Sequence, residues 1–161
     1  MDDIYVFDTS SWIEAGQHYP QITFSKLWDV YFQGLIRNNR LIAPREVFNE
    51  IVPKKGPEVY KYCNSNKRTF VNYSQELFPL VTEILAQHRA LIQPNKRSAQ
   101  ADPFVIALAR LTKSNNITNS GVLIVTQENA ADRNKIPFVG RFYGIECIKL
   151  VDLFQREGWK F

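Results

Sequence analysis

Short apolar runs alternate with longer stretches of helical periodicity along the chain. The apolar runs are bounded by polar residues, Pro or Gly and fall at residues 4–7, 41–43, 122–125 and 147–150, as is typical of strands. Between them, apolar positions recur with helical spacing at residues 24–37, 44–52, 74–91 and 102–113. Strands that alternate with helices predict an α/β fold with a mostly parallel central sheet. The polar segments 53–68, 93–101 and 127–144 are expected to form loops or short helices.

An acid follows the first apolar run directly, because Asp8 comes after the letters IYVF. Ser11 and Glu14 have the spacing of a capping box, so we expect a helix to begin at Ser11. This leaves Asp8 without a local structural role. Ligands of parallel α/β proteins bind outside the carboxyl ends of the strands, which makes Asp8 the first candidate functional residue.

Two glutamates lie one turn apart on the helix predicted for residues 44–52, with Pro44 at its first position. Glu46 falls in the first turn, where the helix dipole favours a carboxylate. Glu50 lies near the other end, where the dipole disfavours a carboxylate. Glu50 is therefore either a cleft residue or an ordinary solvated side chain.

Asp102 stands before Pro103 at the start of the helix predicted for residues 102–113. An Asp followed by Pro at this place predicts a helix N-cap. The same helix face continues through Ile106 and Ala109 as an apolar stripe, which is where a ligand in a buried cleft would lie. The two roles are compatible, and both stay open.

Thr126 follows the run VLIV much as Asp8 follows IYVF, and two further acids come after it. We prefer Glu128 as the fourth candidate because it is closer to the strand end, and we hold Asp132 in reserve. Either acid has an alternative role as part of a loop surface.

Composition narrows the class of protein. With 161 residues, of which 45% are hydrophobic, the chain is expected to form a single domain over residues 1–161. Cys63 and Cys147 lie far apart, and the chain has only 2 histidines, so we expect neither a zinc site nor a disulfide framework. The sequence shows no signal peptide and no run of about 18 apolar residues, which predicts a soluble, cytoplasmic protein without a membrane span. A net charge of +4 favours a nucleic-acid partner.

Four motifs in order resemble those of the PIN domain family of metal-dependent nucleases: VFDTSSW, PREVFNEI, ADPFVIALA and VLIVTQE. The chain is most similar to the toxin-like (VapC-like) prokaryotic members, including a poorly characterised PIN-like branch whose chains end in a loop such as KIPFVGRFYGIECIKL. The resemblance implies a three-layer α/β/α sandwich with acids at the carboxyl edge of a mostly parallel sheet.

The resemblance also implies a role for each matching residue. The catalytic and metal-binding acids would be Asp8, Glu50, Asp102 and Glu128. The hydroxyl positions beside the substrate would be Thr9, Ser10 and Thr126. Many members carry Asp where this chain has Glu128, which leaves a second metal site open to question.

An all-carboxylate site predicts a hard cation, Mg²⁺ or Mn²⁺, because thiolates and imidazoles are absent from the motifs. Carboxylates held close together raise one another's pKa, and a divalent ion reverses that penalty. The ion would also lower the pKa of a water molecule for in-line attack on an RNA phosphodiester. The predicted activity is therefore that of a metal-dependent endoribonuclease.

Basic and aromatic side chains supply candidates for holding the substrate. Lys96, Arg97 and Arg133 lie in predicted loops, where they either bind phosphates or serve solubility; Lys54–Lys55, Lys67–Arg68 and Lys135 are similar. Three tyrosines among these cations are candidates for stacking on unpaired bases, namely Tyr60, Tyr62 and Tyr73.

The resemblance implies binding partners, and two alternative functions remain. Toxin-like relatives are made beside a protein antitoxin, and many form homodimers, so we expect both here in addition to the RNA substrate. One rival is a non-catalytic RNA- or protein-binding module on the same fold. The other is a haloacid-dehalogenase-like phosphohydrolase, which is weaker because that pattern places a second Asp two residues after the first, where Ser10 stands.

Overall fold

A parallel sheet forms the centre of the computed structural model, which describes residues 2–93, 95 and 100–161. Its five strands are all paired in parallel, in the order β3-β2-β1-β4-β5. The strands are β1 (Ile4–Phe7), β2 (Leu41–Pro44), β3 (Phe70–Val71), β4 (Val122–Val125) and β5 (Glu146–Ile148). The α/β class and the parallel sheet expected from the sequence are confirmed.

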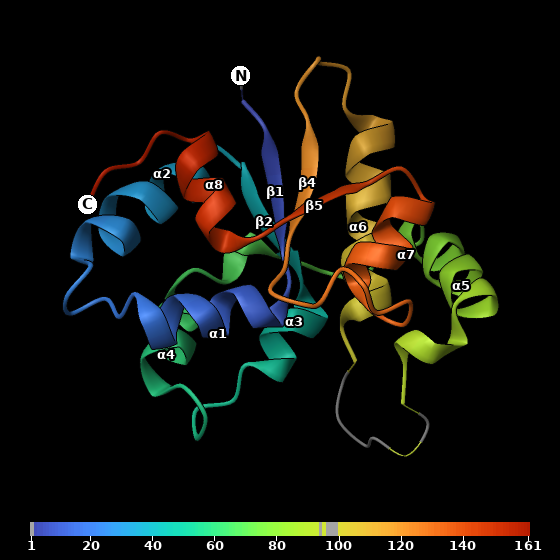
Figure 1. Ribbon diagram of the computed structural model, residues 1–161, viewed down its shortest axis with the longest axis horizontal. Coiled ribbons are helices and arrows are strands. Elements are labelled where there is room, and N and C mark those ends of the chain that lie inside the picture. Colours follow the sequence, from blue (N-terminus) through green and yellow to red (C-terminus); the bar gives the residue numbers. More distant parts are fainter. Residues whose placement is uncertain (1, 94, 96–99) are drawn as a thin grey trace.

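Eight α-helices in the described residues flank the sheet. They are α1 (Thr9–His18), α2 (Gln33–Arg37), α3 (Arg45–Glu50), α4 (Pro57–Ser65), α5 (Leu77–Gln87), α6 (Asp102–Asn115), α7 (Ile136–Phe142) and α8 (Leu150–Arg156). Figure 1 shows α1, α2, α4 and α8 on one side of the strands and α5, α6 and α7 on the other, which gives three layers. None of the described helices is long and apolar enough to cross a bilayer.

The two central strands are apolar along their whole length because helices cover both of their faces. All four residues of β4 are buried, as are the last three of β1. Their register pairs Val6 with Ile124 and Phe7 with Val125. The residues that follow the two strands, Asp8 and Thr126, are therefore brought side by side at the carboxyl edge of the sheet.

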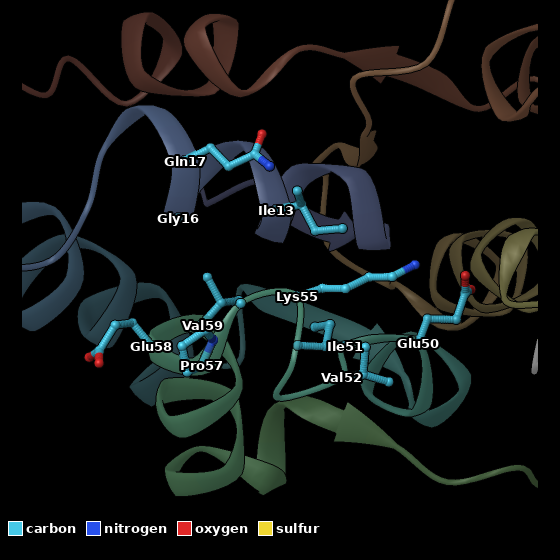
Figure 2. A pocket seen from close by; sticks show the side chains of 11 residues that line it. Ile13, Gly16, Gln17, Glu50, Ile51, Val52, Lys55, Pro57, Glu58 and Val59 are labelled. Atoms are coloured by element: carbon cyan, nitrogen blue, oxygen red, sulfur yellow. The ribbon is translucent and has the colours of Figure 1, made fainter.

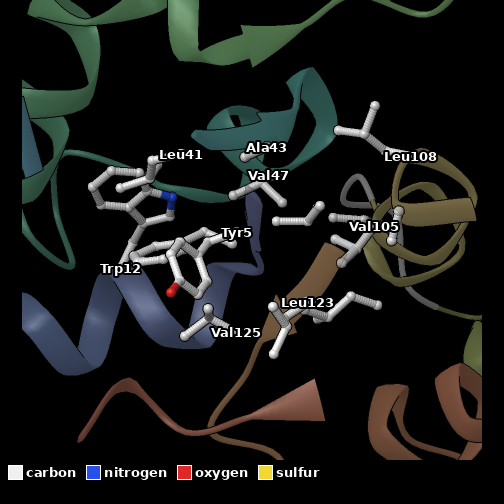
Figure 3. Packing of buried hydrophobic residues seen from close by; sticks show 14 of the residues in the cluster. Tyr5, Trp12, Leu41, Ala43, Val47, Val105, Leu108, Leu123 and Val125 are labelled. Atoms are coloured by element: carbon white, nitrogen blue, oxygen red, sulfur yellow. The ribbon is translucent and has the colours of Figure 1, made fainter. Parts of the chain in front are cut away.

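The core packs against this pair of strands (Figure 3). Trp12 of α1 is fully buried on one face, where its ring lies 5.1 Å from that of Phe7. Val105 and Leu108 of α6 are also buried, and α6 contacts β1, β2 and β4. Burial of such large apolar side chains stabilises the fold by about 1.5–3 kcal/mol for each residue.

Residues 24–37, predicted as one helix, change their winding. Leu27–Phe32 form a π-helix that continues into α2. Leu27 and Phe32 lie five residues apart and are both buried. Because a π-helix bonds residue i to i+5, this winding brings both side chains to the same side, whereas an α-helix would separate them.

Other boundaries also differ from those predicted. The helix expected over residues 44–52 is the shorter α3, because Pro44 ends β2 and serves as the N-cap. The segments expected as loops or short helices contain α4 and α7, each with Pro in its first turn. Helix α5 ends at Gln87, before a 3₁₀ turn at Arg89–Leu91. The last strand stops at Ile148, since α8 begins at Leu150.

Candidate active site

Four acids from four separate segments line one pocket at the carboxyl edge of the sheet. Asp8 follows β1, Glu50 ends α3, Asp102 begins α6 and Glu128 follows β4. The pocket encloses about 260 Å³. The four acids named from the sequence are therefore brought together in space, although they lie far apart along the chain.

Asp8 is buried and held by three donors. Its Oδ1 accepts a hydrogen bond from the backbone N–H of Ser11 at 2.9 Å, and its Oδ2 accepts one from Thr126 Oγ1 at 2.6 Å. Ser10 Oγ donates to the same carboxylate at 2.7 Å. Burial is the largest influence on the Asp8 pKa and raises it to about 6, although the three donors pull it down.

The expected start of the first helix is wrong. Helix α1 begins at Thr9, and Asp8 is its N-cap through the bond to the Ser11 N–H. Ser11 does not cap the helix with its own hydroxyl, because Ser11 Oγ donates to the carbonyl of Val125 at 2.6 Å. Asp8 therefore has a structural role that the capping-box spacing concealed.

Asp102 is the first residue of α6 and does not cap it. The N-cap is Ala101, which makes no capping bond with its own side chain, so the N-cap role predicted for Asp102 is wrong. The Asp102 pKa is raised to about 7, first by burial and then by the charges of Glu128, Asp8 and Glu50, against a smaller lowering by Lys135. Asp102 is therefore the acid on which the charges of the cluster act together.

Glu50 joins two elements. Its Oε1 accepts a hydrogen bond from the backbone N–H of Ala101 at 2.8 Å, which ties the end of α3 to the start of α6. Glu50 lines the pocket, so of the two roles left open for it the cleft is the observed one. Glu46, one turn earlier, is absent from the residues that line this pocket.

Glu128, rather than Asp132, reaches the pocket. Glu128 Oε2 accepts from the backbone N–H of Ile136 at 2.9 Å, at the start of α7, and Oε1 lies 4.0 Å from Lys135 Nζ. Asp132 lies outside the pocket lining, and its Oδ1 accepts from the N–H of Asn134 at 2.9 Å within its own loop. The reserve candidate therefore has a local structural use instead.

The residues predicted to bind substrate are only partly gathered here. Thr9 and Ser10 line the pocket, whereas Thr126 is buried beneath Asp8. Among the described residues, Thr9 Oγ1 has no hydrogen-bond partner. Arg133 is exposed and does not line the pocket. Lys96 and Arg97 lie outside the described residues.

Some residues that line the pocket were not predicted from the sequence, and the role predicted for one tyrosine is wrong. Lys135 lines the pocket, although it was only one cation of a cluster in the sequence. Gln93 and Gln100 line it too, joined by reciprocal bonds of 2.5 and 2.9 Å between the Gln100 amide and the Gln93 backbone, for which the sequence holds no signal. Tyr62 is buried and donates to the carbonyl of Trp28, so its predicted stacking on bases is wrong.

The donor set suits a hard divalent cation, because the four acids offer only oxygen atoms. Their side chains are not yet gathered around one point: the described residues contain no group of three or more acids, His or Cys that could hold a metal ion. Glu50 and Glu128 instead accept bonds from backbone N–H groups. Asp8 also accepts from a backbone N–H, that of Ser11, so the binding of one cation by all four acids would require some of these side chains to move.

Comparison with known proteins gives a family without an assigned activity. Residues 5–161 match a family described as a domain of unknown function (DUF4411). No curated protein matches the chain, and no solved structure matches it. Because the family match extends over nearly the whole sequence, the chain belongs to the DUF4411 family.

Proposed function

We propose that this chain is a divalent-metal-dependent endoribonuclease of the PIN type. One observation carries the proposal: four carboxylates from four segments line a single pocket, and the pKa values of Asp8 and Asp102 are raised to about 6 and about 7. Such a cluster of like charges is unfavourable at neutral pH unless a cation joins it. The order of the motifs, shared with PIN nucleases, supports the same activity.

The residues of the pocket divide into ligands, positioning groups and one cation. Asp8, Asp102, Glu50 and Glu128 would hold the metal ion through their carboxylate oxygens. Bound Mg²⁺ or Mn²⁺ supplies an activated water and offsets charge on the phosphate. Ser10 and Thr126 orient Asp8 through the hydrogen bonds that they donate to it. Lys135, which lines the pocket, offers a positive charge to the phosphate group of the RNA.

The test is cleavage of total RNA by the purified protein with Mg²⁺, Mn²⁺ or EDTA. We expect discrete fragments with metal only, and their loss in Asp8→Asn, by at least about a hundredfold, because Asn keeps the helix cap but weakens metal binding. Asp29→Asn, at an exposed acid on the π-helix, is the control and should cleave like the wild type. Full metal-dependent cleavage by Asp8→Asn would overturn the assignment.

A non-catalytic RNA- or protein-binding module is the second candidate. It is favoured by the two glutamates, which are bonded to the backbone N–H groups of Ala101 and Ile136. Tight RNA binding without cleavage at any divalent ion would support it. A phosphohydrolase that forms a phosphoaspartate is less favoured, because Ser10 occupies the place of the second acid and bonds to Asp8; a covalent phosphoryl adduct on Asp8 would revive it.

The proposed role in the cell is that of a toxin with a protein antitoxin. The similarity to toxin-like PIN proteins supports this role, together with a homodimeric state and a cytoplasmic location. Growth arrest on expression, absent in Asp8→Asn, is the expected result. Light scattering of the purified protein measures whether it is a dimer.

A further inference from the structure

An apolar pocket opens beside the acids, between α1 and the segment that joins α3 to α4 (Figure 2). It encloses about 190 Å³. Its walls include Ile13 from α1 and Val52 from the joining segment, whose side chains are 39% and 38% exposed. Ile13 and Glu50 line both this pocket and the acidic one, so the two pockets are adjacent.

A glycine of α1 is in close contact with α4 at this pocket. A Cβ atom added at Gly16 of α1 would lie 2.2 Å from Val59 Cγ2 of α4, so the Val59 side chain packs directly against the backbone of α1. Val59 is buried. Gly16 and Val59 both line the pocket, so this close contact forms part of its wall.

A cation and an amide accompany the apolar walls. Figure 2 shows the side chain of Lys55 running across the pocket towards Glu50, at the side nearest the acids. Gln17 stands at the rim, on α1. These features match the parts of a nucleotide. The apolar walls suit the base, the Gln17 amide at the rim suits the edge of the base, and the positive charge of Lys55, on the side of the proposed reaction, suits the phosphate.

A second pocket borders the apolar one on the side away from Glu50. This further pocket shares Gly16, Glu58 and Val59 with the first. The apolar pocket therefore lies between the acidic pocket, on the side of Glu50, and this further pocket, on the side of Glu58, which places a nucleotide bound in it directly beside the acids. A protein helix laid on the same surface would have no need of a path into the acidic pocket.

We propose that the apolar pocket binds the nucleoside next to the phosphodiester that is cut, with its base against Ile13 and Val52 and its phosphate at Lys55. This inference rests on the proposed nuclease function and deepens it. The substrate is then single-stranded RNA with a preferred base at one position beside the cut, because a base in a pocket is read by the shape and the polar groups of its walls.

Filling the pocket tests the proposal. Val52→Trp places a ring where the base would lie, and Val151→Trp places the same ring on an exposed site of α8 as the control. The ends of fragments cut from an RNA pool should show a base preference for the wild type and Val151→Trp, and none for Val52→Trp. On an oligonucleotide of the preferred sequence, kcat/KM should fall at least about tenfold in Val52→Trp, the size expected for one lost base contact.

An abasic substrate separates the subsite from the reaction. The wild type should cut an oligonucleotide that lacks the base beside the cut about as slowly as Val52→Trp cuts the intact one. Equal cleavage of both oligonucleotides by the wild type, or an unchanged base preference in Val52→Trp, would overturn the subsite and leave the nuclease assignment standing.

If the protein cuts no RNA, its affinity for RNA tests the proposed subsite instead. Fluorescence anisotropy with a labelled single-stranded RNA then compares the wild type, Val52→Trp and Val151→Trp. Binding weakened about tenfold in Val52→Trp alone would support the subsite while the nuclease proposal fails. Equal binding by all three, or an absence of RNA binding with capture of a protein partner at this groove, would overturn the subsite.

Discussion

Asp8 serves the fold and the site with the same carboxylate. It caps α1 through the Ser11 N–H and faces the pocket shared with the other acids. Because the cap fixes the side chain at the end of β1, the orientation of this acid is set by folding and does not depend on a ligand. Substitution by Asn preserves that orientation, since Asn and Asp cap helices about equally well.

Asp102 makes the stability of the metal-free protein depend on pH. Its pKa is about 7 in the folded state and near 3.8 when unperturbed, so between pH 4 and 7 the folded state binds more protons than the unfolded one. The free energy of unfolding therefore falls as pH rises through this range. In EDTA at pH 8, Asp102→Asn should be more stable than the wild type by about 1–3 kcal/mol, as measured by urea unfolding.

The same measurement at low pH is the control for Asp102. At pH 4 the advantage of Asp102→Asn should disappear, because the wild-type carboxyl is then protonated in the folded state. Addition of Mg²⁺ at pH 8 should stabilise the wild type more than the variant. An advantage of equal size at both pH values would contradict the proposed charge repulsion.

At the scale of elements, the loop between β4 and α7 offers two acids in different surroundings. Glu128→Gln should lower RNA cleavage at least about tenfold, because it removes a carboxylate from the pocket while leaving an oxygen to accept from Ile136 N–H. Asp132→Asn, whose carboxylate bonds within the loop, should leave cleavage unchanged. The reverse order of effects would make Asp132 the fourth acid.

The contact of α1 with α4 predicts opposite effects at two helical glycines. Gly16→Ala should lower the free energy of unfolding by about 1–3 kcal/mol, because the added methyl group meets Val59 Cγ2. Gly34→Ala in α2, where nothing lies within 4 Å of the added atom, should raise it by about 0.5–1 kcal/mol through helix propensity.

Thermal unfolding monitored by circular dichroism measures both glycine variants. Val59→Ala introduced into Gly16→Ala should restore part of the loss, because it removes the clashing methyl group. If Gly16→Ala is as stable as Gly34→Ala, the close approach of α1 and α4 is not the reason for a glycine there.

How much the sequence predicts depends on how local each feature is. Strands β1 and β4 are predictable because residues covered on both faces are all apolar, whereas the two-residue edge strand β3 carries no such pattern. The four acids of the pocket were also identifiable, since each stands at or near the end of an element. The partners of their carboxylates were not, because the Glu50 bond to Ala101 spans 51 positions.

The first helix shows the same limit. Capping-box spacing at Ser11 predicts a start that local rules favour. The hydroxyl of Ser11 instead donates a hydrogen bond to the carbonyl of Val125, 114 positions away, and Asp8 is the N-cap of the helix. A long-range hydrogen bond of this kind cannot be identified from spacing along the chain.

At the scale of the whole molecule, a network of ions lies at the amino end of the sheet, opposite the acids. Arg40 Nη2 bonds to Glu157 Oε1, which also accepts from Tyr5 Oη at 2.6 Å, and Arg156 Nε bonds to Asp3 Oδ2 at 2.7 Å. These contacts join the end of α8 and the residue after it to Tyr5 of β1 and to Asp3 and Arg40, which precede β1 and β2. The network therefore connects the C-terminal helix to the amino end of the sheet.

Removing one ion of this network should affect stability and leave the site intact. Glu157→Ala should lower the free energy of unfolding by about 2–4 kcal/mol, because it leaves the largely buried Arg40 without its charge partner. RNA cleavage at a temperature where the variant is folded should remain that of the wild type. A loss of cleavage without a loss of stability would mean that the two ends of the sheet are coupled.

The pairing of β1 with β4 also sets when the site can form during synthesis. Thr126 donates to Asp8 across 118 positions of sequence, and Glu128 follows two residues later. A growing chain on the ribosome lacks these partners of Asp8 until residues 126 and 128 have been synthesised. For a protein that cuts RNA, the nascent polypeptide would thus lack a complete site while the segment before β4 is being synthesised.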